Sequence, residues 1–310
     1  MARAGVSGVL PVFQTPFDQH GEVDFDALQR EITWLLDEEA DGVVFAMVSE
    51  ILRMSSYERD TVAAAACEYV GTRGTTVISV GAESTKVALV HARHAQTVGA
   101  SAIMATPPAQ HRAGDEELLR HFVSIAESVD LPIIVQDASR YVGTSLSTGL
   151  QARLYRELGD RCMFKPEALP IGPRLSELMD ATDGQALVFE GTGGLYLIDS
   201  FRRGVVGTMP AADLVWALVA LWGALVDGDF DRSYAIAGPL ALMVSQQTSL
   251  DSFVAIEKHL LVAQGVIESA EMRGPLSHGI DDKALAECER LMQLLREAVD
   301  DDEEDADSVG

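Results

Sequence analysis

Short apolar runs alternate with longer amphipathic stretches through the first three quarters of the chain. In the first of these stretches, Leu28, Ile32 and Leu35 recur at the spacing of one helix face. The pattern therefore predicts eight buried strands, each followed by an amphipathic helix. The predicted strands are 8–13, 42–47, 75–80, 102–105, 132–135, 162–164, 187–189 and 205–206.

Repeated strand-then-helix units imply parallel strands, because no two-residue hairpin turns connect them. Eight such units predict an α/β fold, a closed (β/α)8 TIM barrel over residues 1–228. A doubly wound open sheet is the alternative, although no GxGxxG motif follows the first strand. Residues 229–299 are predicted to form an additional C-terminal helical region, and residues 300–310 a disordered acidic tail.

The net charge and the cysteine content argue against several kinds of binding partner. The net charge is −25, which argues against a nucleic-acid partner or an anionic membrane. The three cysteines form no CxxC pair, and no His/Asp/Glu cluster has metal-ligand spacing, so no metal is expected. Without a membrane-length apolar run or a secretory leader pattern, a cytoplasmic protein is expected.

Lys165 is the candidate reactive residue, at the end of an apolar run between a phenylalanine and a proline. The chain has only three other lysines, Lys86, Lys258 and Lys283, all in stretches interpreted as helix surfaces. Apolar surroundings disfavour the ammonium form of a lysine and favour the neutral amine that attacks carbonyl groups. The alternative is a strand-end lysine whose charged head reaches water.

The residues at the other predicted strand ends bear hydroxyl, amide and carboxylate groups. A single amine among such groups suits a 2-oxo acid, since the amine takes the ketone while hydroxyl and backbone N–H groups hold the carboxylate. We therefore expect a small-molecule 2-oxo acid as partner. The predicted substrate-binding residues are Thr15, Ser49, Glu50, Thr106, Gly191 and Val206. The turn at 191–194 also fits a phosphate site.

Several sequence motifs, taken in their order along residues 8–276, resemble those of one known family. They are the segment 8–17 with Gly21-Glu22-Val23-Asp24, Asp41-Gly42-Val43-Val44 with Ser49-Glu50 and Glu58-Arg59, Gly99-Ala100 with Thr106-Pro107, Leu131-Pro132-Ile133-Ile134, Phe164-Lys165 and Gly204-Val205-Val206-Gly207. In this order the chain resembles the pyruvate-dependent class I aldolases that include dihydrodipicolinate synthase and N-acetylneuraminate lyase. The resemblance implies that Lys165 forms a Schiff base without a cofactor, in a homodimer or homotetramer.

The sequence departs from this family at its proton carriers. Gln136 replaces the family's tyrosine after the fifth strand, and an amide orients water or carbonyl groups but does not exchange protons near pH 7. Glu190, Glu167 and His111 are the candidates for proton transfer, and Glu190 is predicted to be catalytic together with Lys165 and Gln136. The alternatives are a structural ion pair for Glu190, a solvated carboxylate for Glu167 and a surface position for His111.

Two other departures affect the walls of the expected site. The family's hydroxyl-rich loop after the second strand is Met47-Val48-Ser49-Glu50 here, with Ser49 as its one hydroxyl. Tyr141, preceded by Arg140, replaces a substrate-binding arginine, and the sequence does not decide which of the two enters the site.

Two functions follow from these features. The first is a Schiff-base-forming lyase, an aldolase or dehydratase, acting on a 2-oxo acid such as a 2-keto-3-deoxy sugar acid or on pyruvate plus an aldehyde. The second is a catalytically silent barrel that binds 2-oxo acids as a sensor or partner-binding module. The family's missing tyrosines favour it: one is Gln136 here, and the tyrosine that a neighbouring subunit contributes in the family is also absent. Formation of an imine without turnover would distinguish the second from the first.

Overall fold

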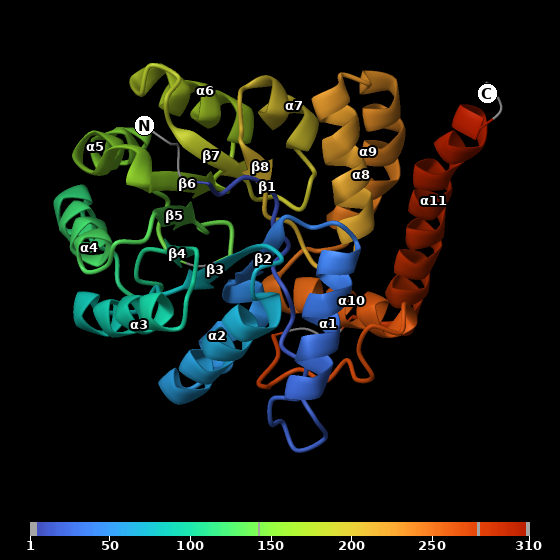
Figure 1. The fold of residues 1–310 in the computed structure, drawn as a ribbon, viewed down its shortest axis with the longest axis horizontal. Helices are drawn as coiled ribbons and strands as arrows, with labels where there is room; N and C mark the ends of the chain where they lie inside the picture. Colours follow the sequence, from blue (N-terminus) through green and yellow to red (C-terminus); the bar gives the residue numbers. More distant parts are fainter. Residues whose placement is uncertain (1–4, 142, 278–279, 308–310) are drawn as a thin grey trace.

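Eight parallel strands form the centre of the molecule (Figure 1). The computed structural model describes residues 5–141, 143–277 and 280–307, with side chains as far as Asp300. Sheet order is β1-β8-β7-β6-β5-β4-β3-β2, and a bridge between Val12 and Val44 joins the two outermost strands into a barrel. The strands are β1 (Gly8–Val9), β2 (Gly42–Phe45), β3 (Thr75–Ser79), β4 (Ala102–Ala105), β5 (Ile133–Asp137), β6 (Cys162–Pro166), β7 (Leu187–Glu190) and β8 (Gly207–Thr208).

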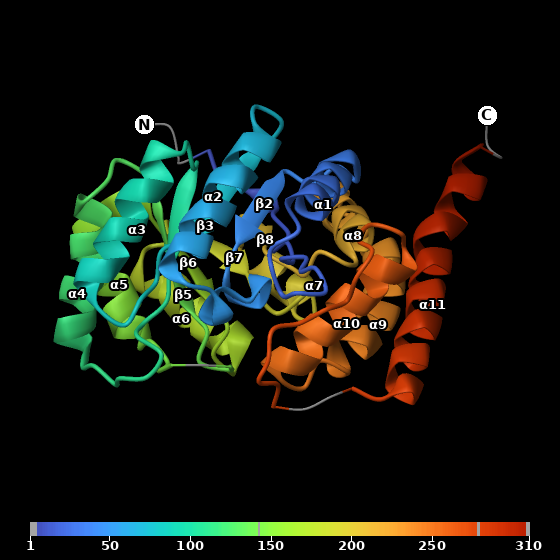
Figure 2. The ribbon, with the colours of Figure 1, turned by 90° about the horizontal axis from the view of Figure 1, so that it is seen from below.

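Helices surround the barrel, and three more extend it on one side (Figures 1 and 2). The predicted boundary at residue 228 falls between α8 and α9, and α11 projects beyond the rest of the structure. The helices are α1 (Phe25–Asp37), α2 (Ser56–Val70), α3 (Thr85–Thr97), α4 (Asp115–Glu127), α5 (Thr148–Leu158), α6 (Ile171–Ala181), α7 (Leu197–Arg202), α8 (Val215–Asp227), α9 (Phe230–Ser245), α10 (Leu250–Ala263) and α11 (Asp282–Asp307). The predicted (β/α)8 barrel with a C-terminal helical region is confirmed.

Three apolar clusters account for this arrangement. One fills the barrel interior with side chains such as Leu10, Met104 and Phe189. The largest lies between the outer faces of the strands and the surrounding helices. The third joins α8 to the C-terminal helices, where Cys288 and Leu295 of α11 are fully buried. Within the described residues, no helix combines the length and apolarity required to cross a membrane.

The first and last predicted strands differ most from the structure. β1 covers Gly8–Val9 rather than 8–13. The eighth strand pairs at Gly207 and Thr208, beside β1 and β7, rather than at 205–206. α11 continues into the acidic segment as far as Asp307, and 308–310 lie outside the described residues, so the disordered tail stays a prediction.

Lys258 is fully buried on α10, which corrects its assignment to a helix surface. Its Nζ lies 2.6 Å from Glu50 Oε1 and 2.6 Å from the Glu271 carbonyl oxygen. The same ammonium lies 4.4 Å from the ring centroid of Phe17. Glu50 Oε2 also accepts the backbone N–H of Arg273 at 3.0 Å. These bonds fix α10 and the segment after it to the loop following β2.

We expect Lys258→Met to lower the free energy of unfolding by about 3–5 kcal/mol, because it leaves the Glu50 carboxylate buried without its cation. Lys86→Met, at an exposed position of α3, is the matched control and should change stability by less than about 0.5 kcal/mol. Urea denaturation of both variants measures the difference. Equal stability of the two variants would contradict a structural role for this ion pair.

A cluster of buried carboxyl groups lies between α1, the segment after β8, and α10. Glu31 Oε1 accepts the Gln14 backbone N–H at 2.7 Å, and Glu257 Oε1 accepts that of Ala212 at 2.8 Å. Burial raises the pKa of Glu31 to about 8. Burial and then the neighbouring carboxyl of Asp213 raise the pKa of Glu257 above its ordinary value of 4.5. The folded chain therefore holds protons that the unfolded chain releases.

Stability should therefore fall as pH rises from the ordinary glutamate range through about 8, since the native state binds more protons over this interval. In Glu31→Gln, the total decrease in the free energy of unfolding over this pH interval should be smaller by several kcal/mol. Each tenfold difference in proton affinity between the folded and unfolded states corresponds to about 1.4 kcal/mol. Unfolding free energies between about pH 5 and 9 measure the effect. Glu127→Gln on the exposed surface of α4 is the control. Identical pH slopes in both variants would refute the prediction.

Candidate active site

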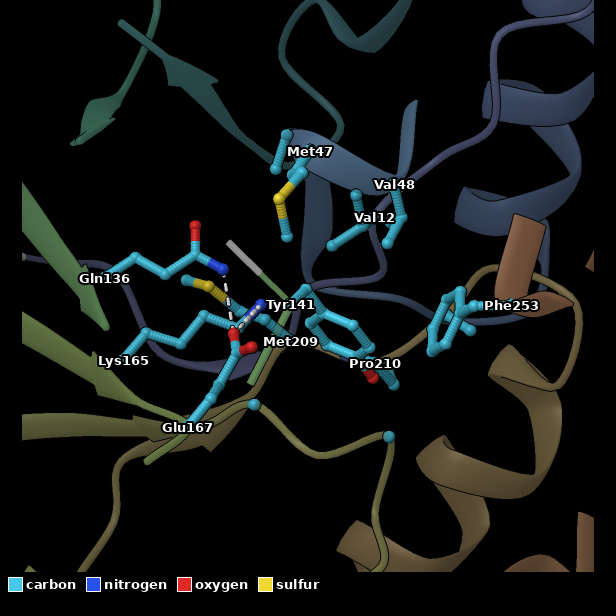
Figure 3. A pocket seen from close by; sticks show the side chains of 14 residues that line it. Val12, Met47, Val48, Gln136, Tyr141, Lys165, Glu167, Met209, Pro210 and Phe253 are labelled. Atoms are coloured by element: carbon cyan, nitrogen blue, oxygen red, sulfur yellow. Dashed lines mark hydrogen bonds and ion pairs between the residues drawn. The ribbon is translucent and has the colours of Figure 1, made fainter. Parts of the chain in front are cut away.

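A pocket opens where the barrel strands end, and Lys165 lies in its wall (Figure 3). Because the strands are parallel, the segments following all of them meet at this face. Lys165 sits near the end of β6 with only 4% of its surface exposed, as the apolar run predicted. The pocket is lined by Val12, Ala46, Met47, Val48, Gln136, Tyr141, Lys165, Glu167, Gly191, Gly193, Met209, Pro210, Ala211 and Phe253.

Lys165, Glu167 and Gln136 form one connected polar group. Glu167 Oε1 lies 3.2 Å from Lys165 Nζ and accepts Gln136 Nε2 at 2.8 Å. The register of β5 and β6 places Gln136 beside Lys165. Glu167 follows two residues after Lys165, so both side chains point to the same side of the extended chain. Figure 3 shows the amine and the amide meeting at the carboxylate.

The Glu167 carboxyl is buried, with 3% of the residue exposed. Burial raises its pKa, while the Lys165 ammonium and the Gln136 amide act in the opposite direction. A carboxyl group with a raised pKa next to an amine is placed to take up a proton from it and return it. Glu167 is thus placed to exchange a proton with Lys165, which the Gln136 amide cannot do.

Gly191 brings the chain after β7 against this group. A Cβ atom at Gly191 would lie 2.7 Å from Lys165 Cε and 2.9 Å from Glu167 Cγ. These distances are too short for any side chain, so only glycine allows the loop to close over the amine. Gly191 is the one predicted substrate-binding residue that the structure places in the pocket lining.

Sequence comparison identifies the family. The model of the dihydrodipicolinate synthetase family matches residues 5–295. This chain belongs to the dihydrodipicolinate synthetase family. An L-2-keto-3-deoxyarabonate dehydratase from Azospirillum brasilense is 27% identical over 277 residues, covering 87% of this chain and 88% of the relative. A 4-hydroxy-tetrahydrodipicolinate synthase from Thermomicrobium roseum is 29% identical over 240 residues, 75% of this chain and 77% of the relative.

Solved structures of the family share the fold. The 4-hydroxy-tetrahydrodipicolinate synthase of Methylacidiphilum fumariolicum SolV has a TM-score of 0.88 at 22% identity, covering 96% of this chain and 99% of that structure. YagE, a prophage protein of Escherichia coli K12 solved in complex with pyruvate, has a TM-score of 0.85 at 23% identity, covering 94% of this chain and 99% of that one.

Glu190, predicted to be catalytic, does not line the pocket of this family member. Its carboxylate accepts the backbone N–H and the hydroxyl of Thr192, the N–H of Gly194 at 3.2 Å and the Thr208 hydroxyl at 2.9 Å. These bonds tie the turn after β7 to β8. These contacts favour the structural alternative for Glu190, through hydrogen bonds rather than the ion pair considered from the sequence.

The predicted carboxylate-binding hydroxyls are also used within the protein. The Ser49 hydroxyl donates to the Phe13 carbonyl oxygen at 2.5 Å, and the Thr15 hydroxyl donates to that of Ser49 at 2.8 Å. Glu50 pairs with Lys258 at 2.6 Å, as described above. The three side chains lie outside the pocket lining and instead hold the loop after β2 in place.

Thr106 and Val206 are the remaining predicted substrate-binding residues. Thr106 follows β4, is half-buried, and does not line the pocket. Val206 precedes β8, and its N–H and carbonyl oxygen are bonded to Val188 and Gly8 at 2.9 and 3.0 Å. It packs against the barrel interior, and the eighth strand starts two residues later than predicted, at Gly207. His111 lies at the surface, with 78% of its side chain exposed, paired with Glu83 at 3.2 Å.

Several pocket residues were not predicted from the sequence. Of the two candidates in the loop after β5, Tyr141 is the one that lines the pocket. Burial raises the pKa of its phenol. Phe253 reaches the site from α10, and nothing in its helical spacing distinguishes it from a core residue. Among the described residues, no group of three His, Cys, Asp or Glu side chains could hold a metal ion.

Proposed function

We propose that this protein is a Schiff-base-forming lyase that acts on a 2-oxo acid. The observation that carries the proposal is a buried lysine 3.2 Å from a buried carboxyl group, in the wall of a pocket at the strand ends. Family membership supports the same chemistry. The amine of Lys165 would attack the ketone carbon and form an imine, so the reaction requires no cofactor.

Glu167 would move the protons in this sequence. It would receive a proton as Lys165 becomes nucleophilic and return it to the departing hydroxyl of the carbinolamine. The protonated imine then accepts the electron pair released at the neighbouring carbon. Gln136, which donates to Glu167 at 2.8 Å, would keep the carboxyl group aimed at Lys165. Its own Oε1 is buried without a protein partner and remains available to orient water or substrate.

The substrate carboxylate would bind backbone N–H groups rather than the predicted hydroxyls. Met47 and Val48 line the pocket at the first turn of a short 3-10 helix, Met47–Ser49. Backbone N–H groups at such a turn have no helical acceptor and point outward toward an anion. This arrangement supports carboxylate binding even though the hydroxyls of the family loop are missing.

Two reactions share the proposed imine. Loss of water is supported by the dehydratase relative from Azospirillum brasilense, which is similar over 87% of this chain. Cleavage to pyruvate plus an aldehyde needs the same imine and a proton acceptor at the C4 hydroxyl. A 2-keto-3-deoxy sugar acid and a pyruvate aldol adduct are both candidate substrates, since each is a 4-hydroxy-2-oxo acid.

If the protein were a catalytically silent binding module, it would form an imine without turnover. The Lys165–Glu167 pair opposes this alternative, because mere binding does not require a proton carrier beside the amine. Incubation with 4-hydroxy-2-oxo acids, with separate assays for released pyruvate and for lost water, tests the proposal. Turnover by either route supports the lyase. Imine formation without either product supports the binding module.

We also propose that the protein assembles as a homo-oligomer and works in the cytoplasm. The family that the chain resembles usually forms dimers or tetramers, and the three cysteines are free thiols, as in a reducing compartment. Sedimentation velocity of the purified chain tests the assembly.

A further inference from the structure

The pocket lining is polar around the Lys165 amine and mostly apolar elsewhere. Its polar side chains are Lys165, Glu167, Gln136 and the phenol of Tyr141, within the described residues that line it. The other walls are apolar or glycine and come from the segments after β1, β2, β7 and β8 and from α10. They are Val12, Ala46, Met47, Val48, Gly191, Gly193, Met209, Pro210, Ala211 and Phe253.

Two aromatic rings define the wall opposite the amine. The ring centroids of Tyr141 and Phe253 are 6.4 Å apart at an interplanar angle of 74°, which is an edge-to-face pair. Figure 3 shows the polar group of Lys165, Gln136 and Glu167 on one side and Phe253 on the other, with Tyr141 between them. The bonds of Lys258 to Glu50 and Glu271, at 2.6 Å each, hold α10 and therefore Phe253 in position.

The apolar wall offers few hydrogen-bond partners, and this should discriminate between substrates. A chain of hydroxyl groups would lose its water on entering and find few partners here, and an unpaired buried hydroxyl is unfavourable. A flat apolar group would instead be buried against the two rings and the side chains of Met47 and Val48. Stacking or edge contacts with an incoming ring would extend the existing aromatic pair.

We propose that the substituent on C4 of the substrate is an aryl group or a comparably flat apolar group, held between Tyr141, Phe253 and the loop after β2. This proposal rests on the proposed function and specifies its substrate class. The enzyme would thus join or separate pyruvate and an aromatic aldehyde, or dehydrate their adduct.

The chemistry balances without an oxidant or reductant. In cleavage, the C3–C4 bond breaks, its electron pair enters the protonated imine to give an enamine, and the C4 hydroxyl loses its proton as the aryl aldehyde forms. The enamine is then protonated at C3, and water releases pyruvate from Lys165. In dehydration, C3 loses a proton and the C4–O bond breaks, so that one water leaves.

A matched pair of substrates tests the proposal. The first is 4-hydroxy-2-oxo-4-phenylbutanoate, and the second is a 2-keto-3-deoxypentonate, with the same reacting carbons but a hydroxylated substituent. We expect kcat/KM, summed over pyruvate release and water loss, to favour the phenyl compound by about 10²-fold or more. Equal values, or preference for the pentonate, would overturn the proposal.

Variants at Phe253 test whether this side chain causes the preference for the phenyl compound. Phe253→Ser should lower kcat/KM for the phenyl compound by about 10-fold or more while leaving that for the pentonate unchanged or raised. Phe253→Leu, which keeps an apolar side chain, should show a smaller loss and covers the case in which the serine variant does not fold. Leu242→Ser, at a 56% exposed position on α9, is the control and should leave the ratio unchanged. An unchanged ratio in both Phe253 variants would refute the assigned wall.

Failure of this proposal can be separated from failure of the proposed function. Borohydride reduction in the presence of pyruvate reports the imine independently of the C4 substituent, because pyruvate has none. An imine together with preference for the pentonate would refute the aryl substituent alone. Absence of any imine would refute the lyase itself.

Discussion

Lys165→Arg is expected to reduce turnover by roughly 10³-fold or more, since a guanidinium keeps the positive charge beside Glu167 but cannot form an imine. The charge preserved beside the buried carboxyl should keep the protein folded, so the loss reports chemistry rather than unfolding. Steady-state assays of pyruvate release and water loss measure it. Lys86→Arg on the exposed face of α3 is the control and should retain full activity. A Lys165→Arg enzyme with more than a tenth of the original turnover would contradict the proposed nucleophile.

Glu167→Gln is expected to lower kcat by about 10²–10⁴-fold while imine formation with pyruvate persists. The variant retains the shape of the side chain but not its exchangeable proton. For the unmodified enzyme, kcat should fall on the acid side as Glu167 takes up a proton. Because burial raises the pKa of this group, the fall should occur above the ordinary glutamate value of 4.5. The pH profile of the variant should lack that limb.

Glu190→Gln is the matched comparison for Glu167→Gln, because both carboxyl groups are buried near β7. It should lower thermal stability, since Glu190 accepts hydrogen bonds from Thr192, Gly194 and Thr208, and should leave kcat within a few-fold of normal. Similar kinetic losses in both variants would remove the distinction between a proton carrier and a structural carboxylate.

The barrel could be predicted because its signals are local. Each strand is a short apolar run, and each helix repeats its apolar residues along one face, so periodicity alone gives the order of the elements. The exception is β8, where 204–207 forms an apolar segment but pairing begins only at Gly207. Register depends on neighbouring strands, and a single sequence carries no information on them.

The pocket residues that could be predicted lie on or directly after strands. Lys165 and Gln136 follow from apolar runs that end in a polar side chain, and Gly191 from the end of the seventh run. The choice between Glu167 and Glu190 depended on which one Thr192 and Thr208 surround, and that requires tertiary structure. Burial of Lys258 was missed because its partner Glu50 is 208 positions away in the sequence. Phe253 was missed for the same reason, since α10 reaches the pocket only through the folding of the whole chain.

Imine trapping with pyruvate is the decisive experiment for the role of Lys165. The protein is incubated with pyruvate, reduced with borohydride, digested and mapped by mass spectrometry. The account predicts a reduced pyruvate adduct on the peptide that contains Lys165 and none on the peptide that contains Lys258, the other buried lysine. No adduct, or an adduct on Lys258 alone, would contradict it.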